Sequence, residues 1–170
     1  MGGDEGHLTF DDFKPVFDKI ANAGYPCTTH AGEHFGPETI LDAVEKLPIS
    51  RIGHGVRISE DEEAVKVIIK KGIVLEICPG SNVSLGVYKN YSEHPFPYLR
   101  NCGCKVTLNS DDPPFFHTNI GKEYENGHVN FGLSIEDLLG ITRTAIDAAF
   151  INEGEKDKLY AKIDSWEYSG

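Results

Sequence analysis

Hydrophobic residues recur along this chain in two patterns, a helical spacing of three and four positions and short continuous apolar runs. Amphipathic helices are predicted over residues 11–23, from residue 37 onward, over 60–71, over 95–102, from 134 to about 150 and over 153–166. Short apolar strands are predicted over residues 25–29, 50–53, 73–77 and 105–109. In the helix over 60–71 we expect Val65, Ile68 and Ile69 to face inward, and Gly72 to end the helix.

The order of these elements indicates the fold class. A strand followed by a helix, repeated four times with mostly apolar strands, predicts a parallel α/β architecture. Polar side chains gather where the predicted strands end, and the active site of a (β/α)₈ barrel is built at those ends. A complete barrel takes about 250 residues. Residues 1–170 therefore predict one domain, half of such a barrel with about four βα units.

Composition and charge narrow the classes of function. The net charge of −11 argues against broad binding to nucleic-acid phosphates, which requires clustered Lys and Arg. No apolar run approaches the roughly 20 residues that cross a bilayer, so we expect no membrane contact. The four cysteines lack the spacing of a disulfide scaffold or a zinc ribbon, and three lie in or beside apolar runs. Buried, reduced thiols and a cytoplasmic location are expected.

Two candidate groups follow the first two predicted strands. In His30-Ala31-Gly32-Glu33, the histidine is a potential metal ligand, and Glu33 in a partly desolvated cleft would have a raised pKa and could donate a proton. Taken alone, these four residues favour a loop histidine and a solvated glutamate over a functional site. His54 lies between Gly53 and Gly55, which would allow a ligand to approach closely.

The strongest candidate follows the fourth predicted strand. Asp111 and Asp112 are adjacent carboxylates that repel each other unless a cation or a donor compensates, and two prolines constrain the turn after them. One of the two could instead serve a turn or a helix cap. We interpret Ser81 and Asn82, after the third strand, as turn residues. The remaining histidines are expected at the surface: His7, His34, His94, His117 and His128.

Several other chemistries lack their motifs. The chain contains neither a G-x-S-x-G nucleophile elbow nor a Gly-rich P-loop. The zinc deaminases that carry H-x-E followed by P-C-x-x-C are also excluded, because Cys78-Pro79 has the reverse order and no second cysteine at that spacing.

Taken in order, five motifs resemble the adenosine and adenine deaminase family over residues 1 to about 165. They are Gly3-Asp4-Glu5, His30-Ala31-Gly32-Glu33, Gly53-His54-Gly55 with Glu60-Asp61, Cys78-Pro79 with Ser81-Asn82, and Asn109-Ser110-Asp111-Asp112-Pro113. The resemblance implies deamination of adenosine to inosine, one Zn²⁺ per complete site and a purine nucleoside as the partner.

The resemblance also implies roles for individual residues. His30 and Asp111 would bind zinc. Glu33 would protonate the purine ring at N1, and His54 would orient and help deprotonate the attacking water. Asp112 would hold the purine at N7, and Gly3 would offer its backbone to N3.

One departure from the family pattern limits these expectations. Family members begin with a strand carrying H-x-H, and no H-x-H occurs in this chain, so the resemblance implies that the first half of the barrel is missing and that the chain is the C-terminal half. His30 and Asp111 are two ligands, whereas a catalytic zinc usually takes three or more from the protein. Half a parallel barrel would also leave strand edges exposed, which favours self-association or pairing with an N-terminal half.

Three alternatives to adenosine deamination stay open at this point. The substrate could be free adenine. The chain could be an inactive half-barrel or a binding module. A two-metal amidohydrolase ranks last, because no Lys stands out at a strand end.

Overall fold

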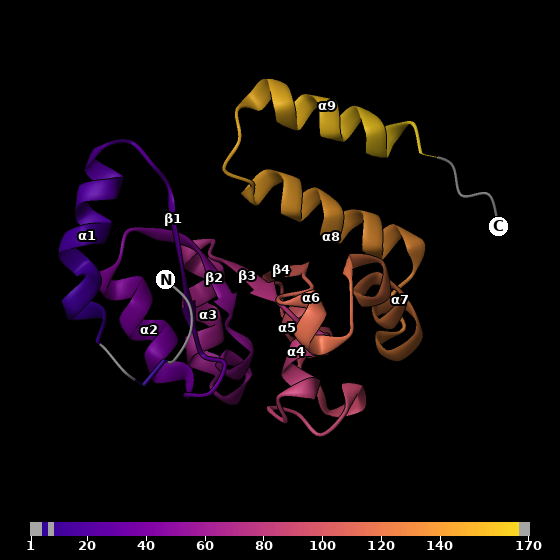
Figure 1. The fold of residues 1–170 in the computed structure, drawn as a ribbon, viewed down its shortest axis with the longest axis horizontal. Helices are drawn as coiled ribbons and strands as arrows, with labels where there is room; N and C mark the ends of the chain where they lie inside the picture. The colour runs from indigo at the N-terminus through magenta and orange to yellow at the C-terminus, as the bar shows by residue number, and fades with distance from the viewer. Residues whose placement is uncertain (1–4, 7–8, 167–170) are drawn as a thin grey trace.

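A four-stranded sheet forms the centre of the computed structural model, which describes residues 5–6 and 9–166 (Figure 1). Its strands are β1 (Cys27–Ala31), β2 (Ile49–His54), β3 (Val74–Ile77) and β4 (Lys105–Leu108). All neighbouring pairs are parallel, and the spatial order β1-β2-β3-β4 follows the sequence. Within the described residues β1 and β4 each pair on one side only, so the predicted strand edges are present.

Helices follow each strand, as predicted for a parallel α/β fold. The helices are α1 (Phe10–Asn22), α2 (Pro37–Lys46), η1 (Val56–Glu60), α3 (Glu62–Lys71), α4 (Pro79–Ser84), η2 (Tyr91–Glu93), α5 (Phe96–Asn101), α6 (Pro113–Phe116), α7 (Ile120–Phe131), α8 (Ile135–Ala148) and α9 (Glu153–Asp164). In Figure 1, α1 and α2 lie at the β1 end of the molecule, whereas α8 and α9 run side by side beyond β4.

The two faces of the sheet differ in chemistry. Because side chains alternate along a strand, one face carries the apolar residues that pack under the helices, including the fully buried Ile52 and Leu75. The register places His30 beside Gly53, Gly53 beside Glu76 and Glu76 beside Thr107 on the other face. This second face is therefore polar and leads to the carboxyl ends of the strands.

The structure corrects some of the predicted details. Strand β1 extends to residue 31 and so includes His30, which the prediction placed just beyond the strand. Ile69, expected to face inward, is 37% exposed, because α3 turns only Ala64, Val65 and Ile68 toward the core. The 12-residue helix α7 was not predicted; its buried positions are Glu123 and Gly127, so it lacks an apolar stripe.

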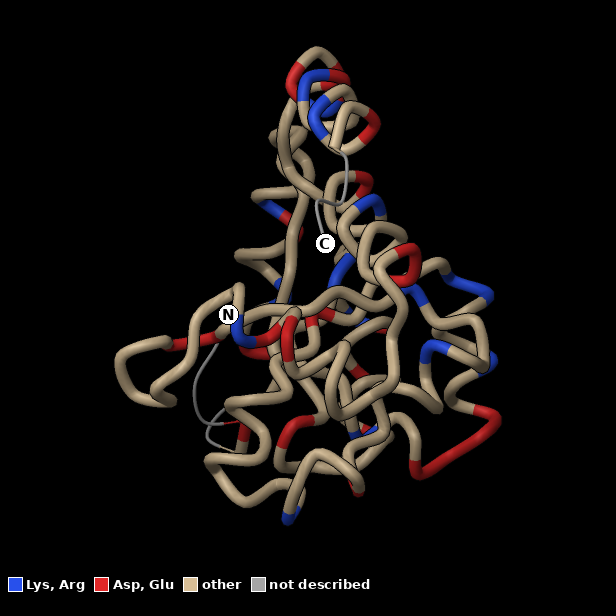
Figure 2. The backbone as a smooth tube through the Cα atoms, turned by 90° about the vertical axis from the view of Figure 1, so that its right-hand side faces the viewer, with Lys and Arg blue, Asp and Glu red and all other residues tan. Residues whose placement is uncertain are grey.

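Acidic and basic residues are interspersed along the described part of the chain. Figure 2 shows Asp and Glu positions interspersed with Lys and Arg along the backbone, including on α9. Among the described residues, no helix is both long and apolar enough to cross a membrane.

Candidate active site

A cavity of about 370 Å³ opens at the carboxyl ends of the strands. Its lining residues are His30, Glu33, His34, His54, Leu85, Asp111, Asp112 and Phe116. The structure thus brings together five of the six residues that the sequence singled out for the site. The sixth, Gly3, lies outside the described residues.

Two of the site residues have unusual backbone conformations. His54 has a φ of 61° and Asp111 a φ of 53°, in the left-handed region that residues other than glycine rarely adopt. Each lies where the chain leaves a strand and turns into the next element. Such conformations persist where the surrounding structure holds them, and they concentrate at functional sites.

Glu33 is buried in the loop after β1. Its Oε1 accepts a hydrogen bond from Asn82 Nδ2 at 3.1 Å, and the residue is 6% exposed. Burial is the main reason that the pKa of Glu33 rises to about 7, and the negative charges of Asp111 and Glu5 add to it. His34, 3.6 Å from Glu33, opposes the rise. A carboxyl group with this pKa can hold a proton at neutral pH and release it to a bound base.

His54 lies at the end of β2 and is 1% exposed. Its Nε2 is 3.7 Å from Asp111 Oδ2, and its ring meets the His30 ring edge-on with centroids 4.8 Å apart. Burial, followed by the nearby charge of His30, lowers the pKa of His54 to about 4. The imidazole is therefore neutral at physiological pH.

Ser81 and Asn82, which we interpreted as turn residues, are instead buried parts of the site. They lie in the short helix α4, directly after β3, and are 1% and 0% exposed. Ser81 Oγ donates to Asp111 Oδ2 at 2.7 Å, and Asn82 contacts both Glu33 and His54. The interpretation as a turn was wrong, because both residues lie in helix α4, which begins directly after β3. Their side chains therefore reach the other strand-end residues of the site.

The prediction for His94 was also wrong. This side chain is 4% exposed and contacts Asn82, although it sits in a Pro-rich stretch that reads as a surface loop. The predicted surface exposure is confirmed for His34, His117 and His128. His7 lies outside the described residues.

Two further carboxylates shape the site, and single-sequence reasoning missed both roles. The Glu5 carboxylate accepts hydrogen bonds from the backbone N–H groups of Glu33, His34 and Phe35, so it holds the loop after β1. Glu123 on α7 is fully buried and accepts from Gly80 N at 3.0 Å, which holds the start of α4. In the sequence, the one indication of such a role was that Glu5 belongs to the motif Gly3-Asp4-Glu5.

Potential metal ligands form two overlapping groups around His54. One contains His30, Glu33 and His54, and the other contains His54, Cys78 and Asp111. His30 and Asp111 line the same cavity, but no described group of three includes both. The imidazole nitrogen of His30 and the carboxylate oxygen of Asp111 are atoms of the kinds that bind zinc. These two residues are one fewer than the three protein ligands that a catalytic zinc usually has.

The cysteines follow the prediction. All four are free, and Cys27, Cys78 and Cys104 are buried. Burial raises the pKa of Cys78 far above its ordinary value, so its thiol stays protonated beside the site.

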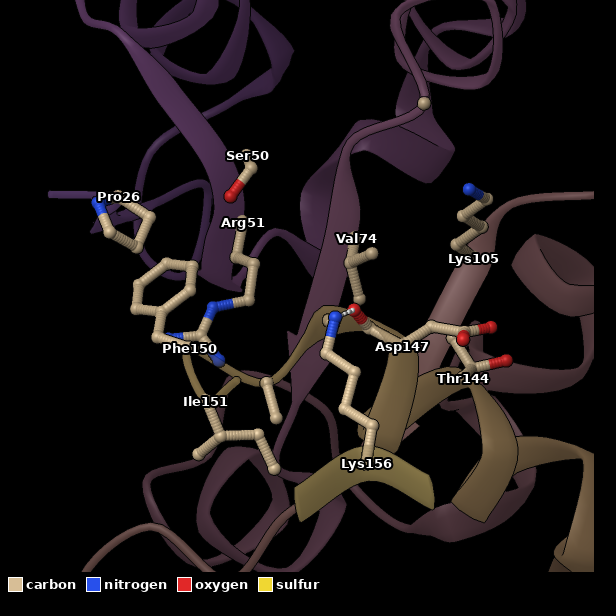
Figure 3. Close-up of a pocket in the computed structure, with 13 residues that line it drawn as sticks. Pro26, Ser50, Arg51, Val74, Lys105, Thr144, Asp147, Phe150, Ile151 and Lys156 are labelled. Carbon is tan, nitrogen blue, oxygen red and sulfur yellow. Dashed lines mark hydrogen bonds between the residues drawn. The ribbon is translucent and has the colours of Figure 1, made fainter. Parts of the chain in front are cut away.

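A second and larger cavity, of about 550 Å³, lies at the opposite ends of the strands. Figure 3 shows Arg51 beneath the Phe150 ring, and Lys156 reaching the backbone oxygen of Asp147. The guanidinium carbon of Arg51 is 3.6 Å from the ring centroid. Among the described residues, the lining of this second cavity contains no histidine and only one carboxylate, Asp147, so it offers no acid–base chemistry comparable to that of the first cavity.

A family model described as adenosine deaminase matches residues 1–166. An adenine deaminase from Rhizobium rhizogenes is 45% identical over 163 residues, which are 96% of this chain and 51% of that protein. The chain spans about half the length of the curated relatives it matches.

Solved structures agree with this match. The adenine deaminase of Arthrobacter aurescens superimposes with a TM-score of 0.92 at 27% identity, covering 97% of this chain and 50% of that one. The Arabidopsis protein ADAL, complexed with IMP, superimposes with a TM-score of 0.87 at 27% identity over 96% of this chain and 47% of its own. The predicted fold, half of a (β/α)₈ barrel, is confirmed by this agreement over half of each longer chain.

Proposed function

Because the chain belongs to the adenosine deaminase family, we propose that it supplies part of an active site for the hydrolytic removal of the exocyclic amino group of a 6-aminopurine. The observation that carries the proposal is the single cavity at the strand ends. His30, Glu33, His54 and Asp111 all line it. Together they offer metal ligands, a proton donor and a polar group for the attacking water.

Adenine is the first substrate to test. The sequence alone put adenosine first, but the relatives that match 96% of this chain are named adenine deaminase. Adenosine, the substrate in the family's description, is second. The IMP complex of the Arabidopsis protein supports a purine as the common part of the ligand.

His30 and Asp111 would hold the zinc ion, with further ligands from outside the described residues. When bound, zinc lowers the pKa of a coordinated water toward 7 and so supplies hydroxide at neutral pH. Ser81 Oγ, which donates to Asp111 Oδ2, would fix the orientation of that carboxylate.

Glu33 would be the proton donor to the ring. Attack of water at C6 of a purine places negative charge on the ring, and a proton delivered to N1 neutralises it. Burial raises the pKa of Glu33 to about 7, which keeps a substantial protonated fraction at neutral pH. Asn82 Nδ2 holds the carboxyl group in place.

The other roles concern positioning. His54, neutral and buried, would orient the attacking water. Asp112 lines the mouth of the cavity, where its exposed carboxyl group would hold the purine at N7. Gly3 stays a proposed contact to N3 on the strength of its motif alone.

A second candidate is a non-catalytic half-barrel. Within the part of the chain that the structure describes, the shortage of metal ligands and the unpaired edges of β1 and β4 favour it. In that case the strand-end residues would keep their arrangement but would bind zinc weakly and would not turn over a purine.

The test compares zinc content and release of ammonia from adenine and from adenosine. It uses the 170-residue chain alone and the chain co-purified with the N-terminal half of the Rhizobium rhizogenes adenine deaminase. Deamination in the mixture supports the proposal, and deamination by the single chain shows that it completes its own site. Stoichiometric assembly without deamination of either substrate favours the non-catalytic reading.

Asp111→Asn is the test variant, because it removes one proposed ligand. Asp157→Asn on α9 is the matched control, since it makes the same change at an exposed position far from the cavity. Equal zinc content in both variants would contradict the assignment of Asp111.

A further inference from the structure

His94 is a buried histidine that the proposed reaction does not use directly. Its ring contacts the rings of Tyr88 and Phe131, with centroid distances of 5.0 and 5.6 Å. Burial lowers its pKa to about 3, so the imidazole is neutral at physiological pH. A neutral imidazole carries one proton, and the nitrogen that holds it follows from its neighbours.

The neighbours of His94 assign that proton. The backbone N–H of Phe96 donates to His94 Nδ1 at 3.1 Å, so Nδ1 must offer its lone pair. The proton therefore sits on Nε2. That nitrogen is 3.2 Å from Asn82 Oδ1, so it donates to the amide oxygen.

This hydrogen bond decides how the Asn82 amide is oriented. With its oxygen held by His94, Asn82 must turn its NH₂ group the other way, toward Glu33 Oε1 at 3.1 Å and His54 Nδ1 at 3.3 Å. The reversed amide would place its NH₂ against the Nε2–H of His94, donor against donor. Asn82 is fully buried, so water cannot compensate for such a mismatch.

The orientation of Asn82 in turn selects the tautomer of His54. Nδ1 of His54 has two possible partners, the Asn82 amide as donor and Glu33 Oε1, 3.4 Å away, as acceptor. While the amide donates to Nδ1, that nitrogen offers its lone pair and carries no proton, so the ring proton of His54 resides on Nε2. That nitrogen points toward Asp111 Oδ2 and the cavity.

We propose that His94 is a positioning residue that, through the amide of Asn82, holds His54 in the tautomer that presents Nε2–H to the cavity. In this form His54 is a hydrogen-bond donor toward the attacking water. It orients that water, and it accepts no proton at Nε2. The role of His94 in catalysis rests on the proposed function. The assignment of the two tautomers rests on the hydrogen bonds alone.

The tautomers are measured directly by long-range ¹H–¹⁵N correlation of the imidazole rings in the uniformly ¹⁵N-labelled 170-residue chain at neutral pH, because protonated and unprotonated ring nitrogens resonate far apart. We expect the proton on Nε2 in both His94 and His54. A proton on Nδ1 of either residue in the wild-type protein overturns the proposal, and this result requires no variant.

His94→Phe removes both ring nitrogens while keeping an aromatic ring in contact with Tyr88 and Phe131. Once Asn82 is free to reverse, the His54 nitrogens are expected to shift toward values averaged between the two tautomers. His94→Gln, which can still donate to Asn82 Oδ1, should restore the wild-type pattern. His128→Phe is the matched control on the exposed side of α7 and should leave the His54 signals unchanged.

Unchanged His54 signals in a folded His94→Phe protein would overturn the relay. If His94→Phe does not fold, Asn82→Asp replaces it, since a carboxylate cannot donate to His54 Nδ1 and should move the proton there. Failure of deamination with the expected tautomers intact would count against the proposed function and not against the relay.

Discussion

The imidazole of His30 occupies the space that a side chain at Gly53 would fill. A Cβ atom on Gly53 would lie 2.4 Å from His30 Cδ2, closer than van der Waals contact allows. The two residues are partners in the register of β1 and β2. The absence of a side chain at position 53 is thus what lets the proposed zinc ligand lie across the neighbouring strand.

Gly53→Ala should therefore displace His30. The added methyl group forces the ring to move, at a cost of about 1–3 kcal/mol in the free energy of unfolding. Zinc affinity, measured by competition with a chelator, should fall as well. Gly140→Ala on α8 is the control, because a Cβ there meets nothing within 4 Å. Zinc affinity equal to that of the control would show that His30 binds no metal.

Glu123→Ala should destabilise the chain although residue 123 lies outside the cavity. It removes the acceptor for the buried N–H of Gly80 and for Thr118 Oγ1. A buried donor without a partner costs about 1–3 kcal/mol in the free energy of unfolding, measured by urea denaturation. Glu123→Gln keeps one carbonyl oxygen and should lose less. Glu125→Ala, exposed on the same helix, should change the stability little.

Asp61→Ala tests the helix that follows β2. The Asp61 carboxylate accepts from the N–H groups of Glu63 and Ala64 and so caps the start of α3. Its loss is expected to lower the unfolding free energy by about 1 kcal/mol. Glu62→Ala, in the first turn without such bonds, should have the smaller effect. Equal effects of the two changes would show that helix-end charge matters here more than the cap.

The neutral state of His94 predicts a stability that depends on pH. Its folded pKa of about 3 lies below the ordinary 6.5, so between these values the unfolded chain binds more protons. Stability must then fall as the pH drops below 6.5. Between pH 6.5 and about pH 5 this residue alone contributes a loss of about 2 kcal/mol.

Urea denaturation across this pH range checks the slope. His94→Gln lacks the titrating group, so its stability should decline less steeply, whatever its offset from the wild type. Parallel curves for the two proteins would mean that His94 is already protonated, or exposed, in the folded state.

Much of the fold was readable from the chain itself. The apolar runs and helical spacings located all four strands to within two residues at either end, because these elements are formed from neighbours in sequence. The acidic and imidazole groups of His30, Glu33, His54 and Asp111 could be singled out because each directly follows or ends a strand. Parallel strands bring such ends together, so their convergence on one cavity was predictable as well.

The supporting residues were decided by tertiary structure alone. Asn82 reaches Glu33 across 49 positions of sequence, and Glu123 reaches Gly80 across 43. No local pattern distinguishes a buried Asn from a turn Asn, or His94 from a surface histidine. Burial and hydrogen-bond partners depend on which segments pack together. For that reason the sequence by itself determined that His30, Glu33, His54 and Asp111 meet at one cavity, whereas the packing of α4, α5 and α7 decided which buried residues support and orient them.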